Sequence, residues 1–116
     1  MSKLLIGKLV RKLRKEKGLS LRQLAEKVSV SFLNIAHIEN GRVSTSKVIL
    51  TQIAIALDYD VDKLLAIGNE ISNDLETIIR DKPETVPAFL RTAKKLTSKQ
   101  WQELTEQVKE MKDKDK

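Results

Sequence analysis

The 116-residue chain contains no cysteine, and this absence removes several kinds of chemistry. Without thiols there is no disulfide framework, no thiolate zinc site and no cysteine nucleophile, and we expect a cytoplasmic protein. Aromatic residues make up only 3% of the chain, with glycine at four positions and proline at two. The apolar run near the start is too short for a signal peptide. No stretch approaches the roughly 20 apolar residues that span a bilayer.

Charge is abundant and unevenly distributed along the chain. Residues 1–66 contain twelve Lys or Arg and six Asp or Glu, a net charge of +6, whereas residues 67–116 contain ten of each. A basic half and a neutral half indicate that one part of the chain meets a polyanion. Nucleic acid is favoured over a membrane surface, because no basic amphipathic stretch carries an exposed aromatic anchor and the only Trp lies in the neutral half.

Apolar periodicity predicts helices and no strand. The first helix is expected to end at Gly18, and the third at Asn40–Gly41. Helices are expected to begin after the cap residues Ser20, Ser31, Ser46, Asp60, Ser72, Thr85 and Thr97, the last forming a capping box with Gln100. The fold class is therefore all-α, with a five-helix unit over residues 1–68 and a three-helix extension over 69–111. The alternating charges of 112–116 predict a disordered tail.

Two short helices joined by a tight turn, inside a basic five-helix unit, describe a helix-turn-helix reader of DNA. The segment Leu13–Ser31, followed by Ile35, Ile38 and the residues Glu39–Arg42, resembles the XRE family of Cro/cI-type repressors. The resemblance covers about half the chain, from Ile6 to Leu65. It implies a five-helix Cro/cI-like domain in a sequence-specific transcriptional regulator. The function predicted first is a dimeric repressor that binds a palindromic operator through the major groove of double-stranded DNA.

The resemblance places groove-facing side chains along the third helix. They are Phe32, Leu33, Ala36 and His37, with Asn34 near the phosphates. Phe32 and Leu33 offer no hydrogen bond, but apolar groups can contact a thymine methyl, and His37 can bond a purine. The alternative is that Phe32 or Leu33 packs inward and His37 is a solvated surface residue. Expected phosphate contacts are Ser20, Arg22, Ser31, Asn40, Arg42 and Lys47.

The family also implies an ion pair between Arg14 and Glu39, for which the alternative is two unrelated surface charges. Two positions depart from the family pattern. Leu21 stands where a phosphate-clamping glutamine is frequent, so we expect that contact to be missing. Ser29 stands at a turn position where glycine is frequent, and a positive φ there would strain a serine.

The second half carries more apolar surface than a five-helix unit needs for its core. We expect a homodimer interface built on Phe89, Leu90, Trp101 and Leu104, the alternative being helices that only complete the core. The string from Asp81 to Thr97 loosely resembles the tails of XRE-type repressors of mobile elements and stress responses. Some of these are controlled by a metallopeptidase or a small antirepressor. The rival function is an antitoxin or interaction module whose C-terminal helices bind a partner such as a toxin, while the N-terminal half autoregulates its operon.

An enzyme has little support in the sequence. The four glycines form no phosphate-binding loop, and His37, the single histidine, has no adjacent nucleophile with a third orienting group. A lone histidine without cysteine neighbours is not expected to bind a metal. We therefore expect no catalytic residue, no metal site and no cofactor.

Overall fold

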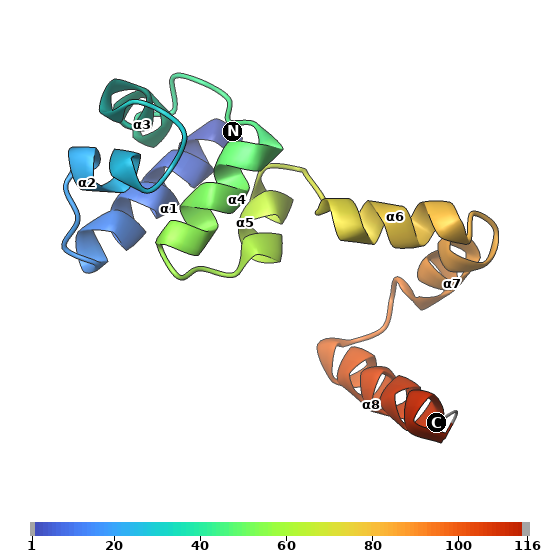
Figure 1. Ribbon diagram of the computed structural model, residues 1–116. Coiled ribbons are helices and arrows are strands. Elements are labelled where there is room, and N and C mark those ends of the chain that lie inside the picture. The colour runs from blue at the N-terminus through green and yellow to red at the C-terminus, as the bar shows by residue number, and fades with distance from the viewer. Residues whose placement is uncertain (1, 115–116) are drawn as a thin grey trace. The chain divides into compact units, whose positions relative to one another are not determined.

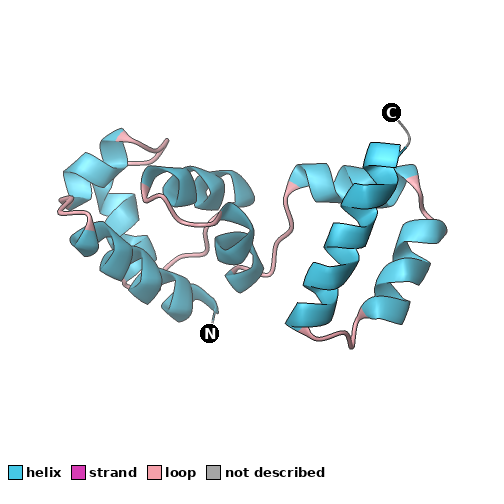
Figure 2. Cartoon of the chain, turned by 90° about the horizontal axis from the view of Figure 1, so that it is seen from below, coloured by secondary structure: helices cyan, strands magenta, loops and turns pink. Residues whose placement is uncertain are grey.

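The computed structural model describes residues 2–114, which form eight helices and no strand (Figures 1 and 2). The expected all-α class is confirmed. The helices are α1 (Ser2–Glu16), α2 (Leu21–Glu26), α3 (Phe32–Glu39), α4 (Lys47–Ala56), α5 (Val61–Ile67), α6 (Asn73–Asp81), α7 (Thr85–Ala93) and α8 (Ser98–Lys114). None of these helices is long and apolar enough to cross a membrane.

Four helices of the first half begin where a short polar side chain precedes an apolar stripe. The side chain of each cap residue accepts a hydrogen bond from the backbone N–H three residues later, which satisfies a donor that the helix itself cannot. These caps are Ser20, Ser31, Ser46 and Asp60. Each cap position is therefore as the sequence predicted.

In the second half, the predicted cap at Thr97 is present and the predicted cap at Thr85 is not. Thr97 and Gln100 form the expected capping box before α8, with each backbone N–H bonded to the other's side chain. Thr85 was expected to cap α7, and this is wrong: it is the first helical residue, and the preceding Glu84 makes no side-chain cap bond. Glu84 already has helical φ and ψ, and its carbonyl and that of Lys82 accept the first amides of the helix. A backbone turn thus replaces the side-chain cap.

Four helices are followed by a residue in the left-handed backbone conformation. Positive φ occurs at Gly18, Gly41, Asp58 and Asn69, each two positions after the last residue of α1, α3, α4 and α5 respectively. After α1, for example, the N–H of Leu19 reaches back to the carbonyl of Arg14 over 3.1 Å. This Schellman arrangement satisfies the last carbonyls of the helix. Gly18 and the Asn40–Gly41 pair were predicted as such ends, and Gly41 carries the positive φ.

The core of the first half joins α1 to α5 around residues with almost no solvent exposure (Figure 1). The largest fully buried side chains are Val10, Leu24, Ile35, Leu50, Ile53, Leu64 and Leu65. Gly7 marks a close approach between two helices in this core, because a Cβ there would lie 2.5 Å from the carbonyl oxygens of Ile38 and Glu39. α1 therefore packs against the end of α3 with no room for a side chain between them.

The chain divides into two compact units, Met1–Glu76 and Thr77–Lys116. The sequence placed the boundary earlier, after residue 68; the first unit reaches further because Lys47 on α4 contacts Asn73 and Glu76 in the first turns of α6. The expected disorder from residue 112 is wrong for 112–114, which continue α8, and residues 115–116 lie outside the described residues. Lys112 and Lys114 lie in the last turn, where positive charge favours a helix end.

Candidate nucleic-acid interface

The turn between α2 and α3 sets the position of the candidate reading helix. α2 ends at Glu26, and Ser31 accepts a hydrogen bond from the N–H of Asn34 to start α3. The strained positive φ expected at Ser29 is not found, so that prediction is wrong. Its N–H instead donates to Gln52 Oε1 on α4 over 2.8 Å. The turn is therefore closed by a side chain from another helix, and no left-handed residue is needed.

α3 has one buried face and one exposed face. Ile35 and Ile38 are in the core, whereas Phe32 is 40% exposed and Leu33 is 57% exposed. Asn34 and Ser31 are exposed as well, and Ala36 and His37 are half-buried. The inward packing considered for Phe32 or Leu33 does not occur. The first turn of α3 thus presents two adjacent apolar side chains to solvent.

Arg22 on α2 lies over the ring of Phe32. The guanidinium carbon is 4.2 Å from the ring centroid, which is a cation–π contact. With Ala25 and Glu26, these two residues line a shallow hollow of about 250 Å³ on the surface of the α2–α3 pair. Two residues expected to have different roles, one at a phosphate and one at a base, are thus in direct contact.

The expected ion pair between α1 and α3 is present. Arg14 Nε and Nη2 donate to the two carboxylate oxygens of Glu39 over 2.6 and 2.9 Å, and Nη1 donates to the carbonyl of Leu19 over 2.8 Å. The side chains are only 11% and 5% exposed. Hydrogen bonding to Glu39 raises the pKa of Arg14 although burial opposes it. Such a bidentate, desolvated pair fixes the C-terminal end of α3 against α1.

The residues expected to contact phosphates differ in how exposed they are. Ser20, Arg22, Asn40 and Arg42 are exposed. Lys47 is not: its ammonium is 2.6 Å from Glu76 Oε1, 3.1 Å from Asn73 Oδ1 and 3.9 Å from Glu70 Oε2. Most of the residues expected at phosphates therefore lie on the surface, while Lys47 is already held among acidic and amide oxygens.

In the second unit, the residues expected at a dimer interface are only partly covered. Phe89 on α7 and Trp101 on α8 meet edge to face, with ring centroids 6.3 Å apart. Phe89 and Leu90 are exposed, while Trp101 and Leu104 are half-buried. Among the described residues of this unit only Ala93 is buried.

Several contacts that position the candidate interface could not be predicted from the sequence. Gln52, which closes the α2–α3 turn, lies 23 residues from its partner, and Glu70 and Glu76 lie 23 and 29 residues from Lys47. Gly7 could have been noticed as an interruption in an otherwise apolar and basic helix. A glycine is needed there because the end of α3 packs against α1 at this point, and the spacing of apolar residues along α1 does not predict that contact.

Comparison with known proteins places this geometry in a family. The family model HTH_3, described as helix-turn-helix, matches residues 10–64. The restriction-modification controller protein C.AhdI from Aeromonas hydrophila is 31% identical with a TM-score of 0.51, and the match covers 53% of this chain and 90% of that one. The chain belongs to the helix-turn-helix family HTH_3.

This HTH_3 protein resembles regulators over different lengths. The competence pilus inhibition repressor of Acinetobacter baylyi is 35% identical over 69 residues, which are 60% of this chain and 63% of the relative. The chain thus spans less than two thirds of that repressor. The solved SinR protein/SinI protein complex contains a chain that is 29% identical with a TM-score of 0.50, matched over 93% of this chain and 98% of its own length.

The XRE-type assignment made from the residues is confirmed, and with it a DNA-binding, helix-turn-helix transcription regulator. In this HTH_3 chain α2 and α3, joined by a tight turn, lie within the matched region as its helix-turn-helix pair. Three contacts hold that pair on the core. They are the Arg14–Glu39 ion pair, the hydrogen bond from Ser29 to Gln52, and the close approach of α3 to Gly7.

Proposed function

We propose that this protein is a dimeric transcriptional repressor that occupies a palindromic operator by inserting α3 into the major groove. The observation that carries the proposal is the exposed first turn of α3. Phe32 and Leu33 face solvent there while Ile35 and Ile38 anchor the same helix in the core. An exposed apolar tip on a basic unit fits the thymine methyl groups between two phosphate ridges.

The two sets of contacts have separate roles in this proposal. Phe32, Leu33, Ala36 and His37 read bases, with Asn34 close to the backbone. Sequence-independent affinity comes from the residues expected to contact phosphates, namely Ser20, Arg22, Ser31, Asn40, Arg42 and Lys47. The net charge of +6 over residues 1–66 supports the electrostatic part.

The second unit supplies the dimer. A unit of about 40 residues rarely buries enough apolar surface to fold alone. Here Phe89, Leu90, Ile78, Val108 and Met111 are all exposed large apolar residues. A second copy of the same unit would cover them around a two-fold axis, and two linked recognition helices would bind paired half-sites about 34 Å apart.

The second candidate is an interaction module whose C-terminal helices bind a different protein. The similarity to a chain solved as the SinR protein/SinI protein complex favours it, because that match extends through the second unit. A toxin, an antirepressor or a regulatory metallopeptidase would then take the place of the second copy.

Selection of binding sites from a random oligonucleotide pool tests the DNA half of the proposal. Phe32→Ala and His37→Ala should each change base preference at defined positions. Arg42→Ala should weaken binding to all sequences about equally and reduce the salt slope by about one. If both kinds of substitution weakened specific and random DNA alike, the base-reading assignment would be withdrawn.

Solution mass tests the dimer. We expect twice the chain mass of 13.2 kDa, and a fall toward the monomer for Phe89→Asp or Leu90→Asp. Leu5→Asp, at an exposed leucine on α1, is the matched control and should leave the mass unchanged. A stoichiometric small protein that co-purifies with the chain would favour the second candidate.

A further inference from the structure

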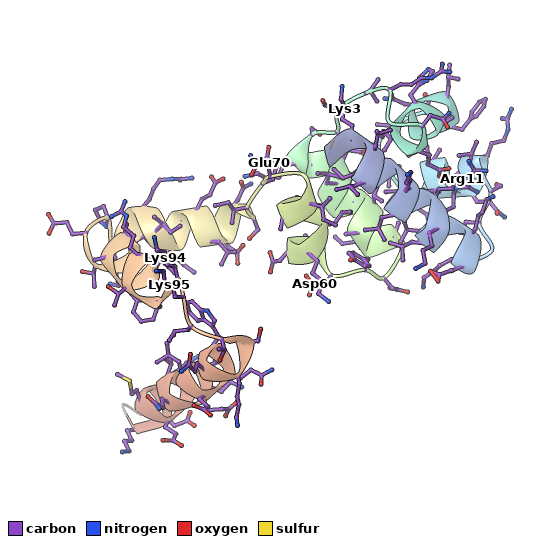
Figure 3. All side chains as sticks on the ribbon, turned by 180° about the vertical axis from the view of Figure 1, so that it is seen from behind. Lys3, Arg11, Asp60, Glu70, Lys94 and Lys95 are labelled. Atoms are coloured by element: carbon purple, nitrogen blue, oxygen red, sulfur yellow. The ribbon has the colours of Figure 1, made fainter. Side chains whose placement is uncertain are left out.

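Lys47 is the first residue of α4, in the unit proposed to bind DNA. Its ammonium nevertheless forms ion pairs with acidic residues of the same chain. Its ammonium contacts Glu76 Oε1 at 2.6 Å and Asn73 Oδ1 at 3.1 Å, with Glu70 Oε2 at 3.9 Å. The Lys47 side chain is only 22% exposed. The oxygens come from the segment that joins α5 to α6 and from the first turns of α6, and Figure 3 labels Glu70 in this segment.

These oxygens satisfy the lysine in the way a phosphate would. An ammonium has three donors: Glu76 and Asn73 accept hydrogen bonds from it here, and Glu70 at 3.9 Å adds a second negative charge. A DNA phosphate at Lys47 therefore competes with two carboxylates for the same positive charge. Until they move, the carboxylates also repel the incoming phosphate.

The surroundings of Lys47 add further negative charge. Asp74 lines the same groove as Lys47, a hollow of about 340 Å³ beside α4. The Ser72 hydroxyl donates to Asp74 over 2.6 Å, and this hydrogen bond lowers the pKa of Asp74. Asp74 is therefore anionic at neutral pH. The start of α6 thus brings an acidic segment to a cation that the proposed function assigns to DNA.

We propose that Glu70 and Glu76 are affinity-determining residues that compete with DNA phosphate for Lys47. The inference rests on the proposed DNA-binding function and adds a regulatory element to it. Phosphate contact at Lys47 and anchoring of the start of α6 on α4 therefore oppose each other. By linkage, any partner that moves the start of α6 changes DNA affinity, and DNA changes the affinity for that partner by the same factor.

The test is DNA affinity of the full chain by fluorescence anisotropy, on a selected site and on a random duplex at several salt concentrations. Glu70→Gln/Glu76→Gln keeps the shape of both side chains and removes their charges. We expect it to bind both duplexes about five- to tenfold more tightly at low salt. Glu103→Gln/Glu110→Gln removes the same charge from exposed positions on α8 and is the matched control, expected to change affinity less than about twofold.

The same double substitution in a Lys47→Gln background separates competition from general electrostatics. Competition requires that the gain over the control disappears when Lys47 is absent. An equal gain with and without Lys47 overturns the inference, as does an unchanged affinity of the double variant. In both of these outcomes wild-type protein still binds duplex, so the proposed function survives. If wild-type protein binds no duplex even in dilute buffer, both fail. Melting temperatures close to wild type verify that each variant is folded.

Discussion

Removal of one partner of the Arg14–Glu39 pair should cost more stability than any other single change to a charged residue of the first unit. Arg14→Ala deletes three hydrogen bonds and leaves the Glu39 carboxylate, which is 5% exposed, without its counter-ion. Breaking a buried pair in this way costs about 3–5 kcal/mol. At about 0.05–0.15 kcal/mol per residue, the 76-residue unit has only about 4–11 kcal/mol in total.

The measurement is urea unfolding followed by far-UV circular dichroism, together with thermal melts. The only tryptophan, Trp101, lies in the second unit, so its fluorescence does not follow the unit in question. A loss of about 3 kcal/mol corresponds to a melting temperature lower by roughly 12 °C or more for a unit of this size. A loss below about 1 kcal/mol would refute the reasoning, because it would mean that the pair is effectively solvated.

Two further variants check the physical cause. Arg11→Ala removes an exposed arginine from the same helix, labelled in Figure 3, and should change stability by less than about 0.5 kcal/mol. Arg14→Met/Glu39→Leu removes both charges and fills the space, and it should recover most of the stability that Arg14→Ala loses. If the double variant were as unstable as Arg14→Ala, lost packing and not an unpaired charge would be responsible.

Three other predictions follow from single contacts. Gly7→Ala places a methyl group against two carbonyl oxygens of α3 and should cost about 1–3 kcal/mol; an unchanged melting temperature would show that α1 can shift. The hydrogen bond from Lys17 lowers the pKa of Asp58, so this ion pair stabilises the fold above the unfolded pKa of Asp58 and is lost as pH falls through the folded value. Lys17→Met should raise that pKa in an NMR titration. Phe32→Leu keeps an apolar side chain but removes the ring under Arg22, so it should lower the unfolding free energy by about 0.5–1 kcal/mol in urea, whereas Phe32→Tyr should not.

The elements that the sequence predicted well depend on contacts within one turn of helix. A Ser20 or Asp60 cap needs only the amide three residues ahead. The prediction of a Thr85 cap was wrong for an equally local reason. The backbone turn before Thr85 already accepts hydrogen bonds from the first amides of α7.

The candidate site was predictable in part. The family pattern named Phe32, Leu33 and the Arg14–Glu39 pair, and the structure adds that the two apolar residues face solvent. That apolar pair could not be oriented from the sequence, because adjacent residues on a helix point about 100° apart and either could have faced the core.

The sequence alone determined where α2 to α5 begin and which half carries the positive charge, since both follow from local spacing and composition. Only the tertiary structure decided that Gln52 closes the α2–α3 turn in place of a left-handed residue, and that acidic residues from the start of α6 occupy Lys47. Those contacts join residues more than 20 positions apart. Their partners are selected by how the helices pack, and no local pattern in the chain contains that information.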